Sequence, residues 1–467
     1  MAVAKRTAAE LATMIGPWHD GAPTADALAS AIAEVIDAGL VPAGTTLPSQ
    51  RDLARQLGIA RGTVSSCYSR LAEQGRLLTR EGSGSRVRTR LSAPGADVTG
   101  RLFSFSDTSR RRIDLSTGAL PASGVAREVI ERTSLTRLDH YLETDGYFPA
   151  GLPVLRVAIA ELLTRDGVAT SPDQILVTNG AQHATALTLS TYLTSGDEVV
   201  AEEPTYRGVL ELLRTRGARI RSVPVGPHGI DVDLLSRALT RSPTLVHVQT
   251  GIHNPTGWST EPPHRRRLAS ALVSWGGTVV EDCCSRDLTG DGRPVPTLAG
   301  LLPDDQLISI GTLSKLYWGG LRVGWLRTSR HRVRALLESR KTTDLSSPII
   351  DQVLAVHLLD SVDEARAERA STLTVSFDRA EDLLHEVCPG WIWTRPRGGA
   401  ALWVDVGTDA VSLAERARAA GVVLAPGPTF SAHGGMTDHL RLPVVHDPEV
   451  LRHALTTVRT LVQRPDR

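Results

Sequence analysis

Short runs of consecutive apolar residues alternate with helix-length segments along most of the chain from residue 113 onward. We predict that the most apolar of these runs are strands: 175–178, 198–201, 220–225, 245–249, 278–281, 307–310 and 323–326. Strands that are apolar along their whole length and alternate with helices are typical of a mostly parallel sheet covered on both faces. Such sheets bind ligands beyond the carboxyl ends of their strands. The pattern therefore predicts a large α/β domain over residues 113–349, with a site at that edge.

A different pattern precedes residue 76, where apolar side chains recur at helical spacing. The groups that share one helix face are Leu28, Ile32 and Val35; Leu53 and Leu57; and Val64, Tyr68 and Leu71. Ser49 is placed to cap the second of these helices, and Gly58 to end it. Two short helices joined by a glycine-containing turn predict a helix-turn-helix, and the glycine-rich stretch 77–87 predicts a β-hairpin wing. We expect residues 1–90 to form this winged helix-turn-helix.

Charge is unevenly distributed along the chain. The net charge is +1, yet residues 51–90 contain nine arginines and only three acidic residues, a balance of +6. The remaining 427 residues therefore carry −5. A basic segment in an otherwise mildly acidic chain indicates that the N-terminal module binds a polyanion. Two alternatives stay open: a solvated arginine face, and a winged module that contacts another protein.

Composition narrows the class of protein. At 467 residues with 41% hydrophobic content, the chain is long enough for more than one domain. The four cysteines lack the paired spacing of a zinc site, so we expect no metal and a reducing compartment. No stretch reaches the length of a membrane span, and the N-terminus lacks the apolar core of a signal peptide. We therefore expect a soluble, cytoplasmic protein without a membrane partner.

A linker and a smaller C-terminal domain complete the expected organisation. Residues 91–112 lose all periodicity and are predicted to be an interdomain linker. Phe103 and Phe105 offer a way to dock this segment, and a flexible tether is the open alternative. After residue 349 we expect a smaller α+β domain, residues 350–467, that folds back over the site.

Candidate chemistry is concentrated around Lys315, which follows the predicted strand 307–310. Its amine can form an imine with a phosphorylated aldehyde, and a partly desolvated site near a cation favours the unprotonated amine that this requires. Thr312, Ser314 and Arg322 are placed to hold the phosphate of such an aldehyde. The spacing therefore predicts a site for a phosphorylated carbonyl compound.

Three further motifs lie at predicted strand ends upstream of Lys315. Gly180-Ala181-Gln182 opens a helix, whose free N–H groups and dipole make a phosphate seat. Asn254 lies in His-Asn-Pro-Thr-Gly, and Asp282 follows strand 278–281. Taken singly, the first and the last have ordinary explanations, because most strand-to-helix turns bind nothing and an aspartate at a strand end commonly caps a helix. Asn254 is the more specific signal. Their combination with Lys315 favours a cofactor site.

Together these residues resemble the fold type I aminotransferases, which bind pyridoxal phosphate. The resemblance implies that Lys315 forms the imine and later acts as the general base at the substrate Cα. It implies that Asn254 donates to the phenolic oxygen of the cofactor and that Asp282 keeps the pyridine nitrogen protonated, so that the ring can accept electrons. Tyr206 resembles the aromatic residue that stacks on the ring, although a lone tyrosine commonly serves packing.

The same resemblance extends to groups that bind the substrate or the partner subunit. Arg441, in Leu-Arg-Leu, resembles the arginine that holds a substrate carboxylate bidentately, and Arg207 is a further anion-facing candidate. In a protein that senses the cofactor alone, Arg441 can instead pair with an acidic side chain. Tyr147 resembles a tyrosine that reaches the phosphate of the partner subunit, which would make the protein a homodimer with shared sites.

The N-terminal module resembles the winged helix-turn-helix of GntR-type bacterial transcription regulators along its whole length. The resemblance implies contacts to double-stranded DNA from Arg51, Arg61, Thr63 and Arg80, with Gly82 letting the wing backbone approach phosphates. Such a module before an aminotransferase-like domain is the arrangement of the MocR subfamily, and the resemblance covers about residues 25–462. It implies a sequence-specific transcription regulator that senses pyridoxal phosphate, an amine or amino acid, or both.

Two segments of the aminotransferase-like part depart from the family pattern. Glu281-Asp282-Cys283-Cys284 stands where the family reads Glu-Asp-Asp-Tyr, and Gly319 stands where it has proline. The family tyrosine donates to the phenolate oxygen of the cofactor, for which Cys284 is shorter and a much weaker donor. We therefore expect a sensor with weak catalysis. The alternatives are an active aminotransferase for a small amino acid with a secondary DNA-binding module, and a racemase or lyase.

Overall fold

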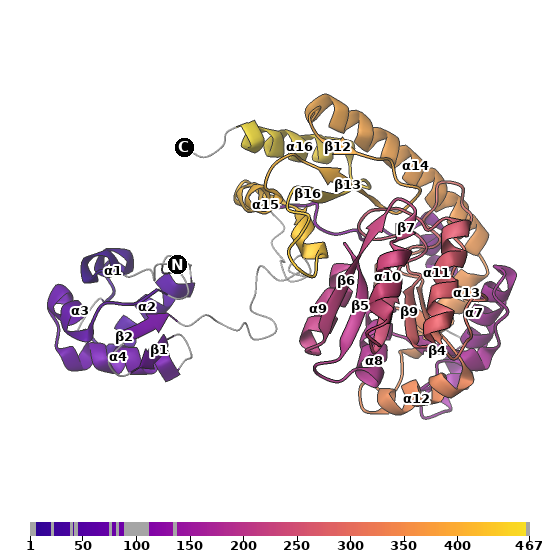
Figure 1. Ribbon diagram of the computed structural model, residues 1–467, viewed down its shortest axis with the longest axis horizontal. Coiled ribbons are helices and arrows are strands. Elements are labelled where there is room, and N and C mark those ends of the chain that lie inside the picture. The colour runs from indigo at the N-terminus through magenta and orange to yellow at the C-terminus, as the bar shows by residue number, and fades with distance from the viewer. Residues whose placement is uncertain are drawn as a thin grey trace. The chain divides into compact units, whose positions relative to one another are not determined.

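A computed structural model gives the arrangement of the chain (Figure 1). It describes residues 6–19, 23–37, 41, 45–73, 77–80, 84–87, 112–133 and 138–463. The chain divides into two compact units, Met1–Thr99 and Gly100–Arg467. The predicted linker lies outside the described residues, apart from Arg112. None of the helices in the described part of the chain has the length and apolar character needed to cross a membrane.

The first unit contains four helices, α1 (Ala8–Ile15), α2 (Ala25–Asp37), α3 (Gln50–Leu57) and α4 (Arg61–Glu73). The Ser49 hydroxyl accepts the Asp52 N–H and caps α3, and Gly58 ends it at φ 67°, as predicted. The core takes one apolar face from each helix, including Leu28, Leu53 and Leu71. The helical pattern of this unit is therefore confirmed.

A β-hairpin completes the first unit. Strands β1 (Leu77–Arg80) and β2 (Gly84–Val87) pair antiparallel, with Leu77 opposite Val87, and Thr46 forms an isolated bridge to Arg86. The Tyr68 hydroxyl donates to the Pro48 carbonyl at 3.0 Å and joins α4 to the start of α3. The predicted winged helix-turn-helix is confirmed, although Gly82 at the tip lies outside the described residues.

An eight-stranded sheet forms the centre of the second unit, in the order β4-β11-β10-β9-β8-β5-β6-β7. Its strands are β4 (Ile175–Thr178), β5 (Glu198–Glu203), β6 (Arg219–Gly226), β7 (Gly229–Ile230), β8 (Leu245–Val248), β9 (Thr278–Asp282), β10 (Leu307–Thr312) and β11 (Gly324–Arg327). Strands β10, β9, β8, β5 and β6 run parallel, whereas β11 is antiparallel to both of its neighbours. All the predicted strands are present, and the sheet is mixed because β11 returns as a hairpin after β10.

Helices cover both faces of this sheet because alternate strand residues point to opposite sides. Val200 and Val279 pack with α10 (Val232–Leu239) and α11 (Pro262–Trp275). Val199 and Val280 pack with α8 (Ala181–Tyr192), α9 (Arg207–Thr215) and α12 (Arg330–Lys341). The remaining helical segments of this part are α5 (Gly124–Arg132), α6 (Asp139–Leu142), α7 (Pro153–Arg165), η3 (Pro172–Gln174), η4 (Gly319–Leu321) and α13 (Ile349–Leu359).

A smaller sheet, in the order β12-β13-β16-β15, lies at the C-terminal end of the second unit. Its elements and their neighbours are α14 (Val362–Val387), β12 (Ile392–Trp393), β13 (Ala401–Asp405), α15 (Ala410–Ala419), β14 (Val422–Val423), β15 (Ala425–Pro426), η5 (Gly427–Phe430), β16 (His439–Pro443) and α16 (Pro448–Gln463). Figure 1 shows α14 running from the large sheet to this one.

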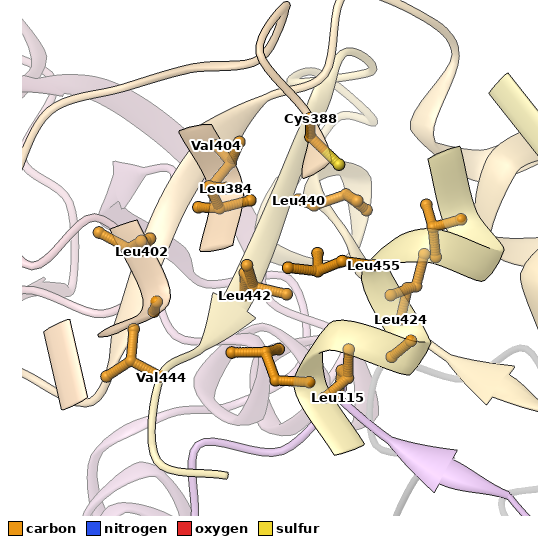
Figure 2. Packing of buried hydrophobic residues seen from close by; sticks show 14 of the residues in the cluster. Leu115, Leu384, Cys388, Leu402, Val404, Leu424, Leu440, Leu442, Val444 and Leu455 are labelled. Carbon is orange, nitrogen blue, oxygen red and sulfur yellow. The ribbon is translucent and has the colours of Figure 1, made fainter. Parts of the chain in front are cut away.

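The start of the second unit packs with this small sheet. Strand β3 (Ile113–Asp114) pairs parallel with β14, and Leu115 is buried in the small core. Figure 2 shows Leu115 in the same cluster of buried side chains as Leu455 of α16 and Leu442 of β16. In contrast, α13 packs against α7 and α5 of the large part. The segment after residue 115 therefore leads from the small core towards the carboxyl ends of the large sheet.

Candidate functional site

Lys315, Asn254 and Arg441 line one pocket at the carboxyl ends of the large sheet. Lys315 follows β10, Asn254 follows β8, and Arg441 comes from β16 of the small sheet. The Lys315 Nζ donates to the carbonyl of Gly118 at 3.1 Å. Burial lowers the pKa of the Lys315 amine, and the charge of Arg441 lowers it further. The Lys315 amine in this pocket therefore loses its proton more readily than an ordinary lysine does.

Asp282 ends β9 beside Cys284. One oxygen of Asp282, Oδ1, accepts the Cys284 backbone N–H at 2.9 Å. Burial, reinforced by the Asp282 charge, raises the pKa of the Cys284 thiol well above its ordinary value, so Cys284 remains a thiol at neutral pH. Burial also raises the pKa of Tyr206 to about 12, with Asp282 adding to the effect. The ring of Tyr206 lies against Gly208, where an added Cβ would come within 2.4 Å of it.

Asn254 is fixed from two sides. Its backbone N–H donates to Gln249 Oε1 at 3.1 Å, and its carbonyl accepts from Gln249 Nε2 at 3.2 Å. Its side-chain Oδ1 accepts from Arg441 Nη1 at 3.1 Å. Because the oxygen of the carboxamide is engaged by Arg441, the amide nitrogen is the group that can donate to a ligand in the pocket.

Two buried guanidinium groups share one carbonyl at the other side of the pocket. Arg441 Nη2 donates to the Ser116 carbonyl at 2.6 Å, and Arg207 Nη2 donates to the same oxygen at 3.1 Å. Arg441 also lies over the ring of Phe430, with 4.9 Å from its Cζ to the ring centroid. Burial lowers the pKa of Arg441 to about 9, and the charge of Arg207 contributes. Two cations forced together out of water favour an anionic ligand.

The turn that the sequence predicts to seat a phosphate lies at the start of α8. Gly180 has φ 78°, and a Cβ added there would lie 2.7 Å from Arg322 Nη2, which donates to the Asn179 carbonyl at 2.9 Å. Gly180 has no side chain to cap α8, so the Ala181 end of the helix presents its first N–H groups to this space. The absence of a Cβ is what allows the guanidinium to lie directly over this turn.

The loop before Lys315 is held by its own hydroxyls. Thr312 Oγ1 donates to the Val323 carbonyl at 2.9 Å and accepts the Ser314 N–H at 3.1 Å. Thr312 is thus committed to the loop, whereas Ser314 is partly exposed. Gln182 Nε2 donates to the Gly208 carbonyl at 3.5 Å and secures α8 against α9.

Some sequence candidates are not among the residues that line this pocket. Tyr147 is 58% exposed, and its backbone N–H donates to Asp145 Oδ1 at 3.1 Å. In the first unit, Arg51 and Arg61 are exposed at the starts of α3 and α4, and Thr63 is partly exposed. The side chain of Arg80 lies outside the described part of the chain.

Sequence reasoning missed Ser116, Gly118 and Gln249. The backbone carbonyls of Ser116 and Gly118 accept hydrogen bonds from Arg441 and Lys315, and the Gln249 carboxamide bonds to Asn254. None of the three missed residues belongs to a motif with charged or nucleophilic residues. The available signal for the first two is the run of small residues directly after the apolar Leu115. A run of this kind is common in loops, so it could not have been singled out.

Family comparisons match two parts of the chain. Residues 111–458 match the family described as aminotransferase class I and II. Residues 24–87 match the bacterial regulatory proteins of the gntR family. The first match covers the whole pocket, and the second covers the predicted helix-turn-helix and wing.

Individual relatives fall into the same two groups. The chain is 32% identical over 312 residues to 2-aminoadipate transaminase of Thermus thermophilus, covering 65% of this chain and 76% of that protein. It is 27% identical over 469 residues to YjiR of Escherichia coli, an uncharacterised HTH-type transcriptional regulator, covering 94% of this chain and 98% of that one. It is 31% identical over 317 residues to the probable rhizopine catabolism regulatory protein MocR of Rhizobium meliloti, covering 63% of each.

A solved structure supports the fold of the second unit. LysN, the α-aminoadipate aminotransferase of Thermus thermophilus in complex with N-(5'-phosphopyridoxyl)-L-leucine, matches with a TM-score of 0.68 and 28% identity. The match covers 76% of this chain and 92% of LysN. The similarity to the transaminases is confined to part of the chain, whereas that to YjiR extends over nearly all of it.

Proposed function

Because the chain belongs to the aminotransferase class I and II family and carries a gntR-type domain ahead of it, we propose that it is a MocR-type transcription regulator controlled through pyridoxal phosphate. The observation that carries the proposal is the pocket that brings Lys315, Asn254 and Arg441 together in a chain that also contains a winged helix-turn-helix. DNA is the target of the first unit, and we place its action in the cytoplasm.

The residues of the pocket fit pyridoxal phosphate. When bound, this cofactor supplies an aldehyde that an amine can capture and a ring that accepts electrons when its nitrogen is protonated. Lys315 offers an amine of lowered pKa, and Asn254 offers its amide nitrogen to the phenolic oxygen. Asp282 would pair with the ring nitrogen. At the other end, Gly180 and Arg322 form a cradle that a Cβ would fill, as a phosphate requires.

We propose an amino acid as the second ligand. Arg441 is buried, and its Nε has no hydrogen-bond partner among the described residues. A carboxylate placed there would compensate the charge of a guanidinium that is out of water. Such a ligand would put its amino group near Lys315, which lines the same pocket.

For the first unit, we propose that Arg51, Arg61 and Thr63 contact DNA. They lie at or near the N-terminal ends of α3 and α4, where side chains and helix dipoles can meet phosphates and base edges. Arg80 and Gly82 of the wing are proposed to contact the phosphate backbone. The exposure of Arg51 and Arg61 supports this assignment.

A homodimer is the proposed working form. Tyr147 is exposed, and so are the apolar side chains of Val154, Val157 and Ile350 on the adjoining helices α7 and α13. A second copy that covered these residues would bring Tyr147 towards the cofactor phosphate of its partner. Two copies would also supply the two DNA-binding modules that a palindromic operator requires.

The test is a titration of the DNA upstream of the gene with cofactor-free protein, cofactor-loaded protein and Lys315→Ala at one fixed salt concentration. We expect specific binding that shifts when pyridoxal phosphate is added and does not shift in Lys315→Ala. Arg61→Ala is the matched control in the first unit. It should weaken DNA binding whether or not the second unit contains the cofactor.

An active aminotransferase is the second candidate, because the chain retains the amine of Lys315, the strand-end carboxylate of Asp282 and the buried guanidinium of Arg441. It predicts keto acid formation from an amino donor at a useful rate, abolished by Lys315→Ala. Lack of specific DNA binding by every form, together with such turnover, would establish the enzyme and reject the regulator.

A further inference from the structure

Helix α14 joins the two parts of the second unit. Its second half packs in the small core through Leu373 and Phe377. Its first half carries Arg366 and Arg369, which are 5% and 2% exposed and bond to the large part. The helix therefore links the small sheet, which carries Arg441, to the segments around Lys315.

Arg369 bonds to the chain directly after Lys315. Its Nε donates to the Leu316 carbonyl at 2.8 Å, and its Nη2 donates to the Tyr317 carbonyl at 2.7 Å. The same Nη2 donates to the Pro121 carbonyl at 2.7 Å. Burial lowers the pKa of Arg369, and its bonds in the described chain are to neutral carbonyl oxygens rather than to a carboxylate. A buried cation satisfied in this way depends on all of its acceptors.

Pro121 belongs to the segment that holds the amine of Lys315. Three residues earlier, the Gly118 carbonyl accepts the Lys315 Nζ at 3.1 Å. On the other side, the Ser123 N–H donates to the Tyr317 carbonyl at 3.0 Å. The guanidinium of Arg369 thus connects the two chain segments that carry the donor and the acceptor of this bond.

The neighbouring residue on α14 secures the same segment. Glu368 accepts the backbone N–H groups of Gly124 and Val125 at 2.6 and 3.0 Å, at the start of α5. Consecutive residues of one helix therefore fix both the segment 121–125 and the residues that follow Lys315. A shift of α14 would change the distance between Lys315 and Gly118.

We propose that Arg369 is a positioning residue for Lys315, holding the amine against the Gly118 carbonyl and coupling it to the small sheet through α14. Arg369 bonds to the backbone around the pocket and acts through Lys315. The inference rests on the proposed cofactor-binding function, but the reactivity of the Lys315 amine can be measured without the cofactor.

The first test labels the cofactor-free protein competitively with acetic anhydride over a range of pH and quantifies Lys315 by mass spectrometry. In Arg369→Lys, we expect the pH-independent rate at Lys315 to rise about fivefold, because the amine loses its fixed, buried position. We expect the labelling midpoint to move up by about half a pH unit or more, towards the ordinary lysine value. Arg369→Gln, which keeps one donor nitrogen with two N–H groups, is a second variant if Arg369→Lys folds poorly by circular dichroism.

Arg366→Lys is the matched control. Arg366 lies one turn earlier on α14, is equally buried, and bonds to Asp287 at 2.9 Å and Asp166 at 3.1 Å rather than to the Lys315 segment. It should lower the melting temperature without changing the labelling of Lys315. Identical labelling of Lys315 in wild type and both Arg369 variants would show a purely structural role and overturn the proposal.

The second readout is a titration with pyridoxal phosphate, followed by the visible absorption of the bound cofactor. Arg369→Lys should move the pH at which this band titrates, whereas Arg366→Lys should not. A wild-type protein that takes up no cofactor would reject the proposed function, and the labelling result would still decide the role of Arg369. A band that titrates identically in Arg369→Lys and wild type would contradict the positioning role.

Discussion

The proposed phosphate side of the site, around Gly180, and its proposed carboxylate side, around Arg441, are built differently. On the phosphate side, Gly180 opens α8 directly after β4, and the exposed Arg322 lies over it. On the carboxylate side, Arg441 and Arg207 are buried and converge on the carbonyl of Ser116. The phosphate side consists of backbone N–H groups and one exposed guanidinium. The carboxylate side consists of two buried guanidinium groups that share one backbone carbonyl.

Within the proposed function, this difference distinguishes a constantly bound ligand from a sensed one. A helix start with nearby cations binds phosphate without rearrangement, since its N–H groups are already oriented. Arg441, in contrast, already bonds to Ser116 and to Asn254. An amino acid carboxylate must compete with these partners, so its binding is expected to move the segment 116–118. We therefore regard the phosphate side as the permanent anchor of the cofactor and the carboxylate side as the responsive part.

The largest effect is expected from a substitution that disrupts the phosphate side alone. Gly180→Ala places a Cβ 2.7 Å from Arg322 Nη2 in the present structure and forces a side chain into φ 78°, ψ 174°. That backbone region costs about 1–3 kcal/mol for residues other than glycine. We expect the affinity for pyridoxal phosphate, measured by absorbance titration, to fall about tenfold or more.

Gly118→Ala is the matched substitution on the carboxylate side. Its Cβ would lie 3.5 Å from Arg441 Nη1, which is an ordinary van der Waals contact. We expect cofactor affinity to stay within about twofold, while amino acids that shift the spectrum of the bound cofactor do so more weakly. Equal loss of cofactor affinity in both variants would show that the two sides do not act separately.

The two sides also differ in how far the sequence reveals them. The phosphate side follows from local signals, because an apolar strand, a glycine and a helix start are consecutive in the chain. The carboxylate side depends on contacts between distant segments: Arg441 and Ser116 are 325 residues apart, and β3 is joined to the small core through its pairing with β14. Arg441 could be predicted from a resemblance, but the acceptor of its bond could not. The acceptors of Arg369 could not be predicted either, because the sequence of its helix does not indicate which backbone carbonyls it contacts.

A buried carboxyl group supports the carboxylate side, and its removal is expected to have an intermediate effect. Glu202 accepts the Gln249 N–H at 2.8 Å, and Gln249 in turn holds Asn254. Burial raises the pKa of Glu202 from 4.5 to about 8. The folded protein therefore binds this proton more tightly than the unfolded chain, and the free energy of unfolding falls as pH rises from 4.5 to about 8. Glu202→Gln should remove this slope, so the variant gains stability relative to wild type at pH 8 compared with pH 5 in thermal melts.

Glu198→Gln, at the start of the same strand, is a control of opposite sign. Arg221 bonds to Glu198 at 2.8 Å and lowers its pKa. Wild type therefore gains stability from this pair above the ordinary glutamate pKa and loses it as pH falls, and Glu198→Gln should remove that gain. Glu202→Gln melts that follow wild type in parallel at all pH values would contradict a protonated Glu202.

The smallest expected effect lies between the two sides, at Cys284, where the family has a tyrosine. The half-buried thiol beside Asp282 stays protonated, so it contributes at most a weak donor to the phenolic oxygen of the cofactor. Cys284→Tyr should lower the pH at which the visible band of the bound cofactor titrates, by about one unit, because a phenol stabilises the deprotonated form more strongly. Cys283→Ala is the control, since its Sγ faces the Glu281 carbonyl at 3.7 Å and lines a different cavity. If Cys284→Tyr titrates as wild type does, the phenolic oxygen lies beyond reach of this position, and the sensor character of the site must come from the carboxylate side alone.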